Sequence, residues 1–170
     1  MTAVSPDPII DRLFRHLAWA DSLLIDAVAA LPDAALEFAA PGSDAWGAGR
    51  ILAHYVGAAG IYATRLEGVA APLRPASPTN AAEVRAIGSL CADYDARLRV
   101  QAALPDGTCT YVREGQTFTR ARSTLVTQAI HHATEHRAQI AGALAAHGVQ
   151  AIDLDALDLW SFGDAEGLRA

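Results

Sequence analysis

Four long segments of the chain repeat apolar side chains at the period of an amphipathic α-helix. In the first segment, about residues 8–31, apolar residues recur at intervals of three, four and seven. The same period runs through residues 43–68, 79–104 and 123–147. Side chains at these intervals share one face of a helix, which must be buried against another element. The pattern therefore predicts an all-α fold, a four-helix bundle.

Residue types at the segment ends agree with these helices. Ser43 or Asp44 can cap the second segment, and Gly68 can end it. Thr79 or Asn80 can cap the third. Before the last helix, residues 108–112 and 117–120 favour strands and flank a turn that contains glycine, which predicts a small β-hairpin insert.

Composition supports helices over a β fold. The 170 residues include 38 alanines, and alanine loses no side-chain entropy in a helix, whereas aromatic residues amount to only 6%. We expect one domain over residues 1–170, with the bundle at about 7–148 and an acidic tail at 149–170. Four apolar residues of the tail are expected to dock on the bundle: Leu154, Leu157, Trp160 and Phe162.

Charge and cysteine usage exclude several classes of function. The net charge is −6 and the arginines form no basic stripe, so no nucleic-acid partner is expected. No apolar run is long enough for a membrane span, and the N-terminus has no signal-peptide pattern. Cys91 and Cys109 lack the spacing of a disulfide framework or zinc site. These features indicate a cytoplasmic protein that acts on a small molecule.

Three of the six histidines form the most informative pattern. His132 and His136 are four residues apart on a predicted helix, so their imidazoles project from one face and can bind one metal ion. Exposed or hydrogen-bonded histidines with no metal are the alternative for such a pair. His54 lies on the apolar stripe of the second segment, where an unpartnered polar group is costly to bury. Placed opposite the pair, it would complete a three-histidine site with open positions, the arrangement of a catalytic metal.

Several stretches of the chain resemble the DinB/YfiT-like superfamily of metalloenzymes. They are Leu13-Phe-Arg-His-Leu-Ala-Trp-Ala20 with Leu31-Pro-Asp33, Ala45-Trp46 with Ile51-Leu-Ala-His54, and His132-Ala-Thr-Glu-His136-Arg-Ala-Gln-Ile140. The order of elements, with an insert before the last helix, is also similar. One departure is Ala138, where the family usually has glycine.

The resemblance implies a bundle with up-down-down-up connections, often a homodimer. It implies a divalent metal, most often zinc or nickel, bound by His54, His132 and His136. It also implies thiol-dependent activities, such as mycothiol-dependent maleylpyruvate isomerisation and thiol S-transfer. A low-molecular-weight thiol is therefore an expected cosubstrate.

The leading hypothesis is a metal-dependent enzyme that activates a small thiol for attack on an electrophile. The alternatives are a hydrolase that activates water and a non-enzymatic, stress-response ligand-binding bundle. The sequence assigns no catalytic residue. Gln128, His131 and Gln139 are candidates for the surroundings of the metal. Solvated positions are expected for Arg137 and Asp95, and a hydrogen-bonded core position for His16.

Overall fold

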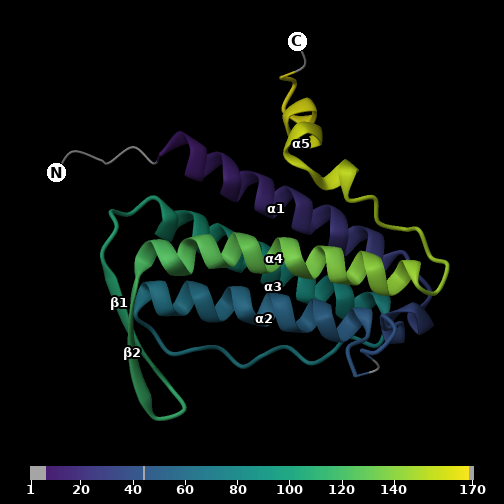
Figure 1. The fold of residues 1–170 in the computed structure, drawn as a ribbon, viewed down its shortest axis with the longest axis horizontal. Coiled ribbons are helices and arrows are strands. Elements are labelled where there is room, and N and C mark those ends of the chain that lie inside the picture. Colours follow the sequence, from purple (N-terminus) through teal and green to yellow (C-terminus); the bar gives the residue numbers. More distant parts are fainter. Residues whose placement is uncertain (1–6, 44, 169–170) are drawn as a thin grey trace.

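The chain folds mostly into helices and adds one small antiparallel hairpin, as predicted (Figure 1). The computed structural model describes residues 7–43 and 45–168. The elements, in chain order, are α1 (Pro8–Ala29), the 3-10 turn η1 (Asp33–Glu37), α2 (Ala48–Glu67), α3 (Ala81–Ala102), β1 (Thr108–Arg113), β2 (Gln116–Ala121), α4 (Arg122–Ala145), η2 (Asp155–Leu157) and α5 (Leu159–Ala165).

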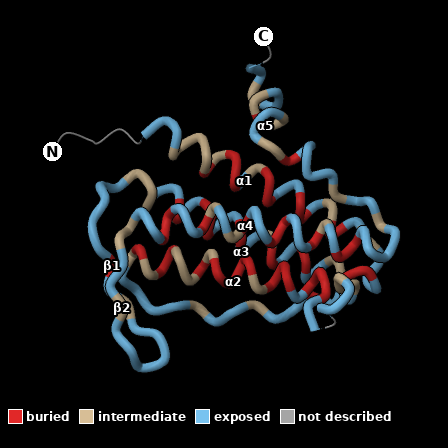
Figure 2. The backbone as a smooth tube through the Cα atoms, viewed as in Figure 1, coloured by how far each residue is buried: buried red, intermediate tan, exposed pale blue. Residues whose placement is uncertain are grey.

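The four long helices pack laterally and bury their apolar stripes between them. α1 packs against α3 and α4, and α2 packs against the same two helices. Buried residues lie along the facing sides of the helices, whereas the hairpin and the loop after α2 are mostly exposed (Figure 2). Phe14, Leu24, Leu52, Leu98 and Ile140 are each fully buried in this core.

Two of the predicted caps are confirmed, and one predicted helix start is wrong. The Asn80 side chain accepts from the Glu83 N–H, and Gly68 ends α2 in the left-handed conformation. However, α2 begins at Ala48 and not near residue 43. The Ala48 N–H donates to the Phe38 carbonyl over 2.9 Å, which ties the preceding residues into a turn. Asp44, the other proposed cap, lies outside the described residues.

The predicted hairpin is confirmed and leads directly into α4. β1 and β2 pair from Thr108 with Ala121 to Arg113 with Gln116. Glu114 and Gly115 both have positive φ at the turn, which is the geometry that suits a tight hairpin. The Arg122 N–H donates to the Gly107 carbonyl, so the first residue of α4 is held against the start of β1.

The acidic tail packs on α1 through only part of the predicted apolar set. Leu157 and Phe162 are buried, but Leu154 and Trp160 are exposed, so the prediction was wrong for these two residues. His16 is a buried, hydrogen-bonded residue as expected, because its Nε2 donates to the Leu157 carbonyl over 2.8 Å. In the described part of the chain, no helix combines the length and apolar character that a membrane crossing requires.

Candidate metal centre

The three predicted histidines meet between two helices. α2 carries His54, and α4 carries His132 and His136 one turn apart. The ring of His54 lies 5.2 Å from that of His132 and 4.8 Å from that of His136, measured between centroids. One nitrogen from each ring lies within 4.8 Å of the others, which is close enough for all three to bind one metal ion.

Hydrogen bonds orient the two histidines of α4 toward each other. His136 Nδ1 donates to Gln139 Oε1 over 2.6 Å, which leaves the lone pair of a neutral ring on Nε2. That Nε2 lies 3.1 Å from His132 Nε2, which must then be the donor between them. A metal ion bound by both Nε2 atoms would take the place of the proton that lies between them.

The surroundings of the site favour uncharged imidazoles, the form that binds metals. Burial, together with smaller effects of charge on His136, His54 and Arg74, lowers the pKa of His132 to about 4. Burial also lowers the pKa of His54, with smaller effects from His136 and Arg74. Because neutral histidine is the ligand, the donor set fits a divalent ion near neutral pH.

Aromatic side chains cover the histidines from two sides. The Trp46 ring meets the His54 ring edge-on at 5.1 Å between centroids. The Arg50 guanidinium group lies over the Trp46 ring, 5.1 Å from its centroid. Tyr62 meets His132 edge-on at 5.7 Å.

The three residues expected around the metal have different surroundings. Gln139 contacts His136 directly, as described above. Gln128 is exposed on α4 and acts on Tyr62 rather than on a histidine. His131 is exposed on α4 and faces away from the other histidines, which places it outside the cluster.

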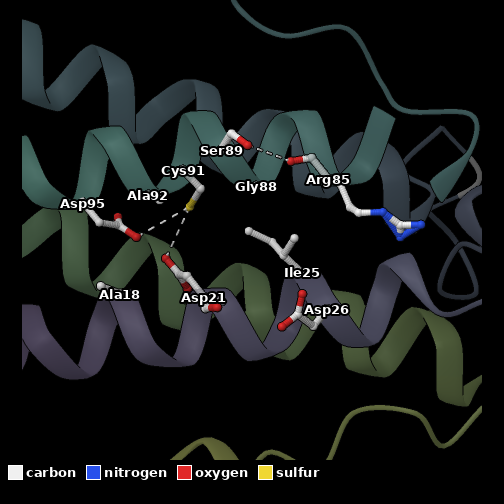
Figure 3. A pocket seen from close by; sticks show the side chains of 11 residues that line it. Ala18, Asp21, Ile25, Asp26, Arg85, Gly88, Ser89, Cys91, Ala92 and Asp95 are labelled. Carbon is white, nitrogen blue, oxygen red and sulfur yellow. Dashed lines mark hydrogen bonds between the residues drawn. The ribbon is translucent and has the colours of Figure 1, made fainter. Parts of the chain in front are cut away.

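A second cluster of polar side chains is buried between α1, α3 and α4. The Cys91 thiol contacts Asp21 at 3.8 Å and Asp95 at 3.7 Å (Figure 3). Arg137 donates to Asp21 over 2.5 Å. A cavity of about 260 Å³ between α1 and α3 reaches Asp21, Cys91 and Asp95. A small space of about 10 Å³, also lined by Asp21 and Asp95, extends to His132.

Solvated positions for Arg137 and Asp95 were therefore a wrong prediction. Their side chains are only 4% and 3% exposed. The signal was present, because Arg137 is three residues before the core residue Ile140, and Asp95 is four residues after the core residue Cys91. Polar residues on an apolar stripe indicate buried partners. Arg137 pairs with Asp21, and Asp95 contacts the Cys91 thiol.

Sequence reasoning also missed Arg74, which lies in the loop after α2. Its charge acts on both His54 and His132. No helical period extends into this loop, so periodicity cannot place Arg74 beside the histidines.

A comparison with protein families identifies the group to which the chain is related. The model of the DinB family matches residues 5–163, which is nearly the whole chain. The chain belongs to the DinB family. This membership and the three clustered histidines together fit a DinB-type metalloprotein that binds a divalent ion. No curated protein matches the chain. No solved structure matches it either.

Proposed function

We propose that this DinB family protein is a divalent-metal-dependent enzyme that activates a small thiol for transfer to, or isomerisation of, an electrophilic small molecule. The supporting observation is the meeting of three imidazoles from α2 and α4, with burial favouring their neutral forms. His54, His132 and His136 are the proposed ligands. Zinc and nickel are the proposed metals because both accept imidazole nitrogen.

The ligand set determines the kind of chemistry that we expect. Three neutral histidines leave the charge of a divalent ion uncompensated, which favours an anionic ligand in an open position. A bound divalent ion lowers the pKa of a thiol or water ligand toward neutrality. The thiol is our preferred ligand because of the similarity to thiol-dependent enzymes of this superfamily.

The chain's own residues have separate roles in this proposal. Gln139 holds the His136 ring with Nε2 turned toward His132. Trp46 and Tyr62 limit access of water to the histidines. Arg74 supplies a positive charge beside His54 and His132 and would attract an anionic substrate.

The expected whole-molecule properties accompany this proposal. We propose one domain with the up-down-down-up connections of a four-helix bundle, in agreement with the lateral packing of the long helices. We also propose a cytoplasmic homodimer, from the similarity to the superfamily. Analytical ultracentrifugation tests the dimer.

Metal analysis of purified protein tests the ligand set. The wild type is expected to hold about one equivalent of metal, and each of His54→Ala, His132→Ala and His136→Ala is expected to lose it. Gln139→Ala should weaken metal affinity about tenfold or more, because a group that orients a ligand contributes that much. Gln128→Ala is the matched control, because it removes the same side chain from an exposed position of the same helix. Unchanged metal content in all three histidine variants would eliminate the site.

Activity assays then separate the proposed enzyme from its alternatives. Turnover of electrophilic substrates by the metal-loaded protein should require an added low-molecular-weight thiol. Turnover of hydrolysable substrates without a thiol would instead identify a hydrolase. Tight retention of a ligand with no turnover in either assay would indicate a binding protein.

A further inference from the structure

A large cavity lies between α2, the loop that follows it and the hairpin. Its volume is about 580 Å³. Three arginines from these three elements line it, namely Arg65 of α2, Arg74 of the loop and Arg113 of β1. Val69, Ala70 and Val112 add apolar surface to the same walls. We call this space the arginine cavity.

The cavity carries excess positive charge although the whole chain has a net charge of −6. Arg113 is paired with Glu114, the one acidic residue of the lining. Arg65 lies over the Tyr111 ring, 4.0 Å from its centroid, and makes no ion pair within residues 7–43 and 45–168. Over the same residues Arg74 has no acidic partner either. Two guanidinium groups are thus left to bind an anion.

Packing of the loop on α2 determines where Arg74 lies. A Cβ atom at Gly57 would be 3.1 Å from Pro75 and 3.5 Å from the Arg74 side chain, so the loop runs directly over this glycine. Pro72 packs in the same way over Gly60. Prolines restrict the backbone of the loop, which lowers the entropy cost of holding Arg74 in place. Gly57 is one helical turn from His54, so Arg74, which lines the cavity, also lies near the histidine site.

Tyr62 of α2 links the cavity to the histidines. Its ring meets that of His132 at 5.7 Å between centroids, and the preceding residue, Ile61, lines the cavity. The cavity and the histidines are therefore neighbours along α2.

We propose that the arginine cavity binds the carboxylate end of an organic substrate, with Arg65 and Arg74 as its ligands. Guanidinium groups match carboxylates in charge and geometry, and the apolar walls suit a carbon skeleton. A molecule bound in this way would extend past Arg74 toward His54 and His132. This assignment rests on the proposed function for its catalytic meaning, but the binding of the anion itself needs no metal.

Titration of the metal-free full-length chain with succinate tests the proposal, and succinamide serves as the neutral probe of similar shape. Nuclear magnetic resonance shifts of backbone amides report both the affinity and the place of binding. Succinate is expected to shift residues 65–74 and 110–114, and succinamide is expected to bind at least tenfold more weakly. Equal binding of the two probes, or shifts confined to other regions, would overturn the proposal.

Arginine variants identify the ligands. Arg74→Gln and Arg65→Gln should each weaken succinate binding about tenfold, the scale of one charge-assisted hydrogen bond. Arg85→Gln is the matched control, because it removes the same charge from an exposed position on α3. Arg74→Lys retains the charge and should lose less affinity than Arg74→Gln. Comparison of these two variants distinguishes the loss of a charge from a folding defect. A loss in Arg85→Gln equal to that in Arg74→Gln would contradict specific binding.

Two further measurements separate the possible failures. Inorganic phosphate that binds as tightly as succinate would show that the cavity accepts any anion, which would overturn the assignment of an organic carboxylate. Metal content of Arg74→Gln should equal that of the wild type. Succinate binding without any metal binding would leave the anion site standing while the proposed function fails. Metal binding without succinate binding would eliminate the anion site and leave the proposed function standing.

Discussion

The Asp95 carboxyl group is buried beside a second carboxyl group, that of Asp21. One arginine between α1 and α4, Arg137, is available to balance the negative charge of both. Arg137 pairs with Asp21, whereas within residues 7–43 and 45–168 Asp95 has only the Cys91 thiol as a hydrogen-bonding neighbour, at 3.7 Å. Burial and, to a smaller extent, the charge of Asp21 raise the pKa of Asp95 to about 8, against the opposing effects of Cys91 and Arg137. Asp95 is therefore the group that carries a proton in the folded state at neutral pH.

This protonation predicts that stability falls as the pH rises from about 4 to about 8. The unfolded chain ionises Asp95 near its ordinary pKa of 3.8, while the folded chain retains the proton up to about pH 8. Unfolding in this window releases a proton, so the free energy of unfolding falls by up to about 1.4 kcal/mol per pH unit and levels off above pH 8. Urea unfolding at several pH values measures the slope.

The variant Asp95→Asn should flatten this dependence and should be more stable than the wild type at pH 8. Asp93→Asn is the control, because the Asp93 side chain is 60% exposed on the same helix. It should retain the slope of the wild type. A slope that survives in Asp95→Asn would assign the proton to another group.

At the scale of elements, α2 is packed closely by α3 and by the loop that follows α2. Its glycines let two neighbours approach the backbone, since a Cβ at Gly60 would lie 2.7 Å from the Tyr94 ring of α3 and 3.2 Å from Pro72. Glycine weakens an isolated helix by about 1 kcal/mol relative to alanine, so contacts with α3 and the loop must offset that cost. The same contacts hold the loop, and Arg74 with it, beside the histidines.

Substitution of two helical glycines by alanine should therefore have opposite effects. Gly60→Ala should lower the free energy of unfolding by about 1–3 kcal/mol, because the new methyl group overlaps a buried tyrosine. Gly142→Ala on α4 should raise it by about 0.5–1 kcal/mol, since nothing lies within 4 Å of the added Cβ. Chemical denaturation measures both. A stable Gly60→Ala protein would show that α3 can move away at little cost.

At the scale of the whole molecule, the histidine site connects two helices that are distant in sequence. His54 comes from α2, and its partners come from α4 on the other side of the hairpin insert. The proposed metal would therefore bind the folded chain and would not bind the unfolded chain with comparable affinity. Its binding free energy would then add to the stability of the fold.

A chelator should accordingly lower the melting temperature of the metal-loaded protein. At a free metal concentration of 100 times Kd, the gain in stability is about 2.7 kcal/mol, which corresponds to roughly 5–10 °C for a chain of this size. Calorimetry with and without chelator measures the shift. His54→Ala should show no shift, whereas His131→Ala, an exposed neighbour of the site, should retain it. An equal shift in both variants would mean that the metal binds elsewhere.

The sequence alone determined the helices, the hairpin and the residues that meet at the candidate site. Amphipathic period and caps depend on neighbours within a few residues, so Asn80 and Gly68 could be assigned as helix ends from local chemistry. The positions of His132 and His136 on one helix face follow from the same short-range geometry. His54 stood out because an apolar stripe rarely contains an unpartnered polar residue.

Only the tertiary structure decided which polar residues are buried together and where the loops lie. Asp21, Asp95 and Arg137 come from three helices, and their pairing depends on how those helices pack. Arg74 lies near the histidine site because Gly57 and Gly60 admit the loop against α2, a contact that no local period encodes. Local patterns specify each element, but the contacts between elements depend on the packing of side chains that are far apart in the chain.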